Sequence, residues 1–233
     1  MNSPLIVALD LPSAEHALQL VRQIGDLVGA FKIGKELFVH AGPDLVRRIR
    51  ETGASVFLDL KFHDIPNTVA RAVAAAVRLD VQMLTVHASG GRAMLEAAER
   101  AARETADTFK TRPPLVLGVT ILTSLNSDAL AEIGMTANVA RQVERLASLA
   151  VHAGLRGLVC SPLEVAALRQ MIPPEIQLVT PGIRDAAAPP DDQQRTLNAR
   201  EAIAAGASWL VVGRPIHSAP DPRKATEAIL DSL

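Results

Sequence analysis

The stretch FLDLKFHDIPNTV (residues 57–69) joins an apolar run to a proline turn and to the start of a helical pattern. Its apolar beginning predicts a buried strand, yet Asp59, Lys61 and Asp64 lie within six residues of sequence. Burying charges is costly unless they are paired or meet a ligand. The stretch therefore predicts either a salt-bridge cluster that neutralises itself or a site whose charges face a bound molecule.

The same strand-then-helix unit recurs along the whole chain. Short, mostly continuous apolar runs predict eight strands, as is typical of parallel strands covered by helices; they are residues 5–10, 30–34, 55–60, 82–88, 115–121, 157–160, 177–182 and 209–213. Between them lie helical patterns such as 13–27, with Ser13 as N-cap, and 138–154, with Gly154 as stop signal.

Eight such units in 233 residues predict an α/β fold, a single (β/α)₈ TIM barrel forming one catalytic domain over 1–233. A doubly wound sheet is the alternative architecture. Against it, the sequence has neither a dinucleotide-binding fingerprint nor a linker that divides the chain.

Composition excludes several classes of function. Hydrophobic residues make up 48% of the chain, the net charge is -1, and aromatic residues are only 3% with no Tyr, so neither nucleic acid nor a membrane is expected as a partner. No signal peptide is recognisable, and the alanine-rich apolar stretch 72–77 is too short to span a bilayer. Cys160 is the only cysteine, which fits a reducing compartment. We expect a cytoplasmic protein.

Chemically active side chains follow the apolar part of nearly every predicted strand. They are Asp10, Lys32, Asp59 with Lys61, His87, Thr120 with Thr123, Arg184 and Arg214. In a barrel these strand ends gather at one mouth, where active sites of this fold lie. This convergence predicts an enzyme.

Lys61 is the candidate for the chemical step. It lies two residues after Asp59 on a strand, so both side chains should point to the same face. Neighbouring carboxylates favour its charged form, which suits delivery of a proton to a carbanion better than Schiff-base formation. Only five of the 24 basic residues are lysines, yet Lys32 and Lys61 both lie in apolar strands. Since lysine can release a proton and arginine cannot, the choice indicates chemistry.

A phosphate site is predicted after the last two strands. TPGIRD (180–185) and VVGRPI (211–216) supply Gly182, Gly213 and Arg214, and barrels often bind phosphate with these two loops. The irregular segment 182–198 is interpreted as a binding loop or lid, with a surface insertion as the alternative.

Two other kinds of site are not supported. GAFKIGKE (29–36) has the glycine spacing of a P-loop but ends in Glu36 where Ser or Thr is needed. No histidine or cysteine spacing predicts a transition-metal site, and Lys61 would compete with a hard cation near Asp59, His63 and Asp64.

Taken together, these motifs resemble the orotidine 5′-phosphate decarboxylase family over essentially the whole chain. The resemblance rests on the D-x-K-x-x-D-I-P-x-T pattern in DLKFHDIPNT (59–68). Further segments agree in order and spacing: LIVALD (5–10), FKIG (31–34), GVTILTS (118–124), TPGIR (180–184), DDQ (191–193) and VVGRPI (211–216).

The resemblance implies conversion of orotidine 5′-monophosphate to uridine 5′-monophosphate, with no cofactor and no metal. Lys61 would protonate C6 within a charge network completed by Lys32, Asp59 and Asp64. A homodimer is implied, in which the partner lends Asp64 and Thr68. The substrate-binding residues implied are Asp10, Lys32, Thr68, Thr123, Arg184, Gln193, Gly213 and Arg214.

Two rival functions remain open on the sequence. One is a metal-dependent phosphosugar decarboxylase or aldolase of the same barrel group, whose members carry a carboxylate where this chain has Lys32. A cation beside Lys32 and Lys61 is electrostatically disfavoured. The other is a barrel that binds a phosphorylated ligand without turnover, a function that would not require Lys61.

Overall fold

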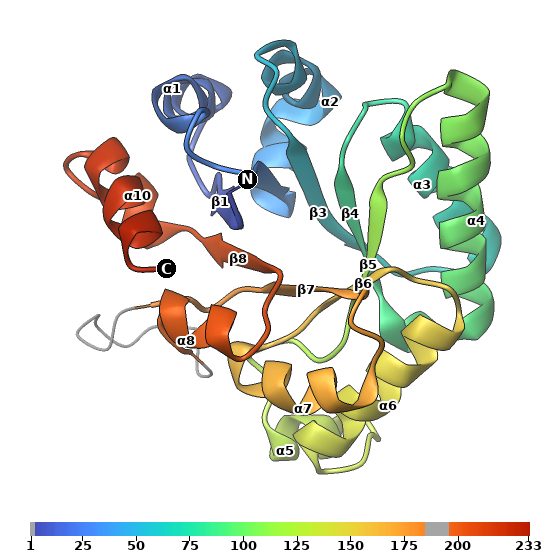
Figure 1. Ribbon diagram of the computed structural model, residues 1–233. Coiled ribbons are helices and arrows are strands. Elements are labelled where there is room, and N and C mark those ends of the chain that lie inside the picture. The colour runs from blue at the N-terminus through green and yellow to red at the C-terminus, as the bar shows by residue number, and fades with distance from the viewer. Residues whose placement is uncertain (1–2, 185–195) are drawn as a thin grey trace.

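The computed structural model describes residues 3–184 and 196–233. Its strands are all parallel and close into a barrel in sequence order, which confirms the predicted architecture (Figure 1). The strands are β1 Leu5–Ala8, β2 Ala30–Gly34, β3 Val56–Phe62, β4 Met83–His87, β5 Leu115–Val119, β6 Gly157–Val159, β7 Gln177–Thr180 and β8 Trp209–Val212.

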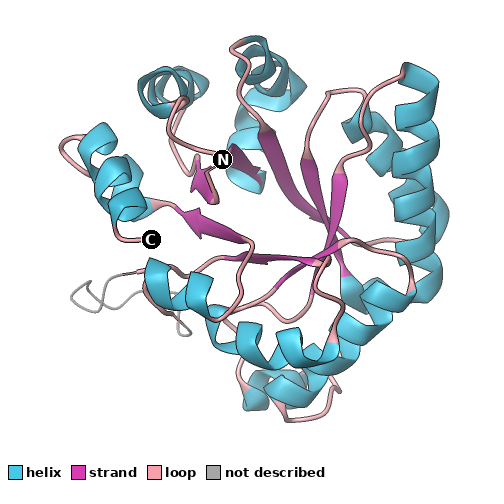
Figure 2. Ribbon diagram, in the orientation of Figure 1, coloured by secondary structure: helices cyan, strands magenta, loops and turns pink. Residues whose placement is uncertain are grey.

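Helices lie outside the ring of strands, as Figure 2 shows. The α-helices are α1 Ala14–Ile24, α2 Lys35–Glu51, α3 Pro66–Val77, α4 Arg92–Phe109, α5 Ser127–Glu132, α6 Val139–His152, α7 Val165–Met171, α8 Ala199–Ala204, α9 Arg214–His217 and α10 Pro222–Asp231. Short 3₁₀ turns follow β4 (η1, Ala88–Gly90) and β6 (η2, Pro162–Glu164). Within the described residues, no helix is both long and apolar enough to cross a membrane.

Alternation along the strands separates two apolar clusters. In β1, Leu5 and Val7 pack with the helices, whereas Ile6 and Ala8 belong to a second cluster. That second cluster fills the barrel interior with one side chain or two from most strands, namely Ile6, Ala8, Ala30, Phe57, Met83, Leu117, Val179 and Val211. The interior is therefore packed, and a ligand can enter only at the ends of the barrel.

Both helices predicted in detail form, with their predicted signals in place. The Ser13 hydroxyl accepts a hydrogen bond from the backbone N–H of His16 at the start of α1. Asn138 caps α6 in the same way through the N–H of Arg141. The chain after α6 reverses at Gly154, whose φ of +87° favours glycine.

Several strands end earlier than the apolar runs suggest. β1 ends at Ala8, so Asp10 lies in the loop that follows, and β5 ends at Val119, before Thr120. β3 instead continues to Phe62, two residues beyond the predicted end, with an irregular register against β4.

Candidate active site

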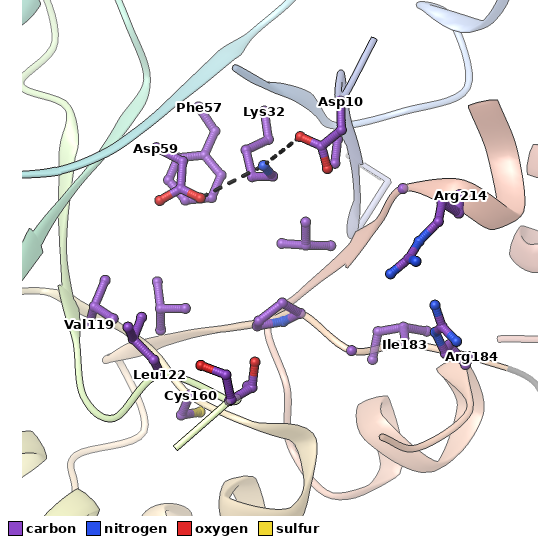
Figure 3. Close-up of a pocket in the computed structure, with 18 of the residues that line it drawn as sticks. Asp10, Lys32, Phe57, Asp59, Val119, Leu122, Cys160, Ile183, Arg184 and Arg214 are labelled. Carbon is purple, nitrogen blue, oxygen red and sulfur yellow. Dashed lines mark hydrogen bonds and ion pairs between the residues drawn. The ribbon is translucent and has the colours of Figure 1, made fainter. Parts of the chain in front are cut away.

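A cavity of about 730 Å³ lies at the carboxyl ends of the strands (Figure 3). Its lining includes nine of the residues predicted from sequence: Asp10, Lys32, Asp59, Lys61, Thr123, Gly182, Arg184, Gly213 and Arg214. Its deeper wall is apolar and comes largely from the barrel interior, through Ala8, Phe57, Val119, Val159 and Val211. Parallel strands thus bring residues from distant parts of the chain to one mouth.

Four charged side chains alternate in sign along one wall of this cavity. The Lys61 ammonium donates to both carboxylate oxygens of Asp59, at 2.8 Å each. Lys32 Nζ lies 3.8 Å from Asp59 Oδ2 and 3.3 Å from Asp10 Oδ1. Figure 3 shows Lys32 between these two carboxylates. The row Asp10–Lys32–Asp59–Lys61 is therefore held by ion pairs within one chain.

Asp59 is ionised at neutral pH despite its burial. Only 12% of its side chain is exposed, and this loss of solvation by itself raises the pKa of the carboxyl. The charges of Lys32 and Lys61 act in the opposite direction, with hydrogen bonds from Lys61 and Thr85. Together they hold the pKa of Asp59 below its usual value of 3.8.

The backbone at Lys61 departs from a regular strand. Lys61 has a φ of +53°, a left-handed conformation that is uncommon for a residue with a side chain. Its N–H donates to Thr85 Oγ1 at 2.8 Å instead of to a strand carbonyl. The predicted meeting of Asp59 and Lys61 is confirmed, although it is achieved through this bend and not by simple alternation.

Thr85 is a site residue that the sequence reasoning missed. It lies in the middle of β4, is completely buried, and donates from its hydroxyl to Asp59 Oδ1 at 3.0 Å. The available signal was a polar residue inside the apolar run 82–88. That signal is weak, because only the register of β4 against β3 places Thr85 beside Asp59.

The other side of the cavity is cationic. Figure 3 shows Arg184 and Arg214 near one another and away from Asp59. Arg214 begins α9 directly after Gly213, and the backbone N–H of Arg184 donates to the carbonyl of Leu197 at 3.0 Å. A Cβ at Gly213 would meet neighbouring atoms only at 3.5 Å or more. These are ordinary van der Waals distances to Ala8, Asp10 and His217, and Gly213 itself lines the cavity beside Arg214.

Two substrate-site residues implied by the resemblance, Asp64 and Thr68, do not line the cavity of the single chain. Asp64 and Thr68 are exposed at the beginning of α3. The Asp64 carboxylate accepts from the N–H of Ile65 at 2.6 Å and, within the described part of the chain, forms no ion pair. Gln193 lies outside the described residues, as does most of the segment 182–198 that the sequence predicts to be a loop or lid.

His87 stands at the end of β4, beside this charged wall. Its ring centroid lies 5.5 Å from that of His63. Burial, followed by the charges of His63, Lys61 and Lys35, lowers the pKa of His87 to about 4. His87 is therefore neutral at pH 7. Among the residues that the structure describes, no group of three or more His, Cys, Asp or Glu side chains is arranged to hold a metal ion.

Proteins of known name are similar in sequence to this chain over nearly its full length. The orotidine 5′-phosphate decarboxylase of Syntrophotalea carbinolica is 51% identical over 229 residues, which cover 98% of this chain and 94% of that protein. The enzyme of the same name from Moorella thermoacetica is 50% identical, covering 97% of this chain and 90% of that protein.

A solved structure supports the same relationship. The crystal structure of orotidine 5′-phosphate decarboxylase from Lactobacillus acidophilus superposes with a TM-score of 0.87 at 39% identity, covering 99% of this chain and 98% of that one. The family described as Orotidine 5′-phosphate decarboxylase / HUMPS matches residues 3–229. The resemblance seen in the sequence is thereby confirmed, and the chain belongs to the orotidine 5′-phosphate decarboxylase / HUMPS family.

Proposed function

We propose that this protein decarboxylates orotidine 5′-monophosphate to uridine 5′-monophosphate, as a single catalytic domain that needs neither a metal nor an organic cofactor. The names of its relatives support this reaction. The observation that carries the proposal is the ammonium of Lys61, held 2.8 Å from both oxygens of Asp59 in the cavity wall.

The chemistry explains why such an ammonium is needed. When the bond between C6 and the carboxylate carbon breaks, CO₂ leaves and the electron pair stays on C6, in the plane of the pyrimidine ring. The ring π-system cannot delocalise that pair, so stabilisation must come from fixed charge in the enzyme. Lys61 supplies the charge and then transfers a proton from Nζ to C6, after which solvent restores the proton.

Asp59 fixes the donor. Its low pKa keeps it anionic at neutral pH, so it holds the ammonium of Lys61 while Lys32 balances it from the other side. In the proposed complex Asp59 faces the carboxylate of the substrate. The apolar wall that includes Phe57 and Val119 excludes water, and this strengthens the charge interactions around the reacting carbon.

The cationic side of the cavity binds the phosphate in this proposal. Arg214 makes a charge-assisted contact to the phosphate, next to Gly213 and Arg184 in the cavity lining. The resemblance to the family adds Gln193 as a further phosphate-binding residue. Asp10 and Lys32 contact the ribose, and Thr123 contacts the base. Binding energy from the remote phosphate then helps to position the pyrimidine against Lys61.

We infer a homodimer in which Asp64 and Thr68 enter the site of the other subunit. Both are exposed on the single chain, and Ile65 between them is 67% exposed despite being apolar. Contact with a second copy would bury Ile65 and bring a carboxylate near the free side of Lys61.

The matched family also includes HUMPS enzymes, so the metal-dependent phosphosugar reaction remains the rival. Lys32 argues against it. Its ammonium lies between Asp10 and Asp59, at 3.3 and 3.8 Å, where a divalent cation would be repelled by it.

The test is the loss of orotidine 5′-monophosphate absorbance, measured with and without EDTA, for the wild type and for Lys61→Ala. We expect rapid loss with the wild type, no effect of EDTA, and nearly no loss with the variant. Lys224→Ala is the matched control, because the side chain of Lys224 is 83% exposed on α10. No turnover by folded wild-type protein would contradict the proposed function, and dependence on Mg²⁺ with a phosphosugar substrate would favour the rival.

A further inference from the structure

Thr85 joins the two groups of the proposed chemical step through a single hydroxyl. Its Oγ1 accepts from the backbone N–H of Lys61 at 2.8 Å and donates to Asp59 Oδ1 at 3.0 Å. The direction of both bonds is settled by chemistry. An amide N–H can only donate and an ionised carboxylate can only accept, so the hydroxyl hydrogen must point to Asp59.

The register of β3 against β4 places Thr85 opposite both Asp59 and Lys61. Leu58 pairs with Leu84 and Phe62 pairs with Val86. The three residues from Asp59 to Lys61 therefore face one residue of β4, which is Thr85. The ordinary ladder between the two strands is interrupted there.

This interruption coincides with the left-handed backbone of Lys61. A φ of +53° is unfavourable for a lysine and persists only where surrounding contacts hold it. The N–H of Lys61, which cannot join the regular ladder in this conformation, is satisfied by Thr85 Oγ1. The hydroxyl therefore fixes the point from which the Lys61 side chain starts.

The same hydroxyl also fixes the plane of the Asp59 carboxylate. Lys61 Nζ approaches both oxygens at 2.8 Å, and the bond from Thr85 to Oδ1 restricts rotation of the carboxylate about its axis. Thr85 is completely buried, so water does not compete for these bonds.

We propose that Thr85 is a positioning residue, whose hydroxyl holds the backbone of Lys61 and the carboxylate of Asp59 in the geometry from which Lys61 delivers its proton. This inference rests on the proposed decarboxylase function. Thr85 itself touches no substrate in this account. Misplacement of a catalytic group by about 1 Å reduces rates by roughly a hundredfold, so a small movement of Lys61 is enough to slow the reaction.

The test compares Thr85→Val, which keeps the shape and removes the hydroxyl, with Thr85→Ser, which keeps the hydroxyl. We expect Thr85→Val to lower kcat by about 10- to 100-fold while KM changes by less than about threefold. Thr85→Ser should retain kcat within about threefold of the wild type, because both hydrogen bonds can still form.

Thr226→Val controls for loss of stability. Thr226 is also completely buried, on α10, and its hydroxyl donates to the carbonyl of Pro222 in its own helix. Its variant should keep the wild-type kcat. Thr85→Val leaves a buried N–H without a partner, which should lower Tm by about 2–6 °C, and kinetics are measured well below both transitions.

Hydrogen–deuterium exchange of a peptide spanning residues 57–65 gives a readout that does not depend on turnover. The Lys61 amide should exchange faster in Thr85→Val than in the wild type, and Thr85→Ser should restore its protection. Thr226→Val should leave this peptide unchanged.

The outcomes separate this inference from the proposed function. A wild-type kcat in Thr85→Val, or equal slowing in the Val and Ser variants, would overturn the role of the hydroxyl while decarboxylation by the wild type still stood. If the wild type does not decarboxylate the substrate, the proposed function fails and this inference fails with it. A slow Val variant, an active Ser variant and faster exchange at Lys61 would establish the positioning role.

Discussion

The ammonium of Lys61 lies 2.8 Å from both carboxylate oxygens of Asp59, in a wall of the cavity where each side chain is mostly buried. Such a pair contributes little net stability, because loss of solvation offsets most of the attraction. What it provides is a fixed cation next to an apolar space. Each buried charge is neutralised by the other, so removing one of the two should lower the free energy of unfolding.

Asp59→Asn should lower the free energy of unfolding by about 3 kcal/mol, because it leaves Lys32 and Lys61 close together without the carboxylate that separates their charges. Urea denaturation measures the change. Asp107→Asn, on the exposed face of α4, is the control and should stay within about 0.5 kcal/mol of the wild type. Equal stability of the wild type and Asp59→Asn would mean that the two lysines do not need this partner.

The stabilising effect of Asp59 should also depend on pH. The pKa of Asp59 is lower in the folded protein than its usual value of 3.8, so the unfolded chain binds the proton more readily. The contribution is therefore complete at neutral pH and is lost as the pH falls below 3.8 through the folded value. The difference in stability between the wild type and Asp59→Asn should shrink over that range, and a difference independent of pH would contradict this.

His87 should produce a second acid dependence at higher pH. Its pKa is about 4 in the folded protein and near the usual 6.5 when unfolded, so the unfolded chain binds more protons between these values. Stability should fall as the pH drops from 6.5 towards 4. Facing charges on His63, Lys61 and Lys35 oppose protonation, and Asp59 favours it.

His87→Gln should reduce this slope between pH 6.5 and 4, measured as Tm or urea midpoint against pH. His40→Gln is the matched control, since His40 is exposed on α2, and it should keep the wild-type slope. An unchanged slope in His87→Gln would show that another group is responsible.

The sequence predicted the fold more completely than it predicted the active site. The eight strands were predictable because each is a continuous apolar run followed by a helical pattern, and the closed barrel then placed Lys32, Asp59 and Lys61 at one mouth. Strand ends were less well predicted, as for β1 at Ala8, because hydrogen bonding and not hydrophobicity decides where a ladder stops.

The features that escaped prediction depend on contacts between distant residues. The left-handed backbone of Lys61 and its bond to Thr85 follow from three residues facing one, a register that no local pattern encodes. The kink of α2 at Gly42, where φ is +64°, was likewise not predicted. The dimer contacts of Asp64 remain a prediction, because a single chain carries no second copy to test them.

Arg214→Ala should separate phosphate binding from chemistry. Loss of a charge-assisted contact to the phosphate should reduce kcat/KM for orotidine 5′-monophosphate by about 10- to 100-fold, mainly through KM. Turnover of orotidine, which lacks the phosphate, should be unaffected by the change. Arg112→Ala, at an exposed position before β5, is the control. Equal loss with both substrates would place Arg214 elsewhere than at the phosphate.

Subunit mixing tests whether Asp64 acts across an interface. Lys61→Ala and Asp64→Ala should each be nearly inactive alone. In a mixed dimer, the subunit that keeps Lys61 receives Asp64 from its partner, so one of the two sites is complete. Random pairing makes about half of the dimers mixed, and refolding the two variants together should therefore restore about a quarter of the wild-type activity.

The control mixture combines Lys61→Ala with Asp59→Asn, whose positions lie in one chain 2.8 Å apart and must serve the same site. Neither site of that mixed dimer is complete, so it should stay inactive, and sedimentation should show the same dimer in both mixtures. If Asp64 instead served its own subunit, the first mixture would also remain inactive. Recovery in the first mixture alone would assign Asp64 to the partner's site and explain its exposure on the isolated chain.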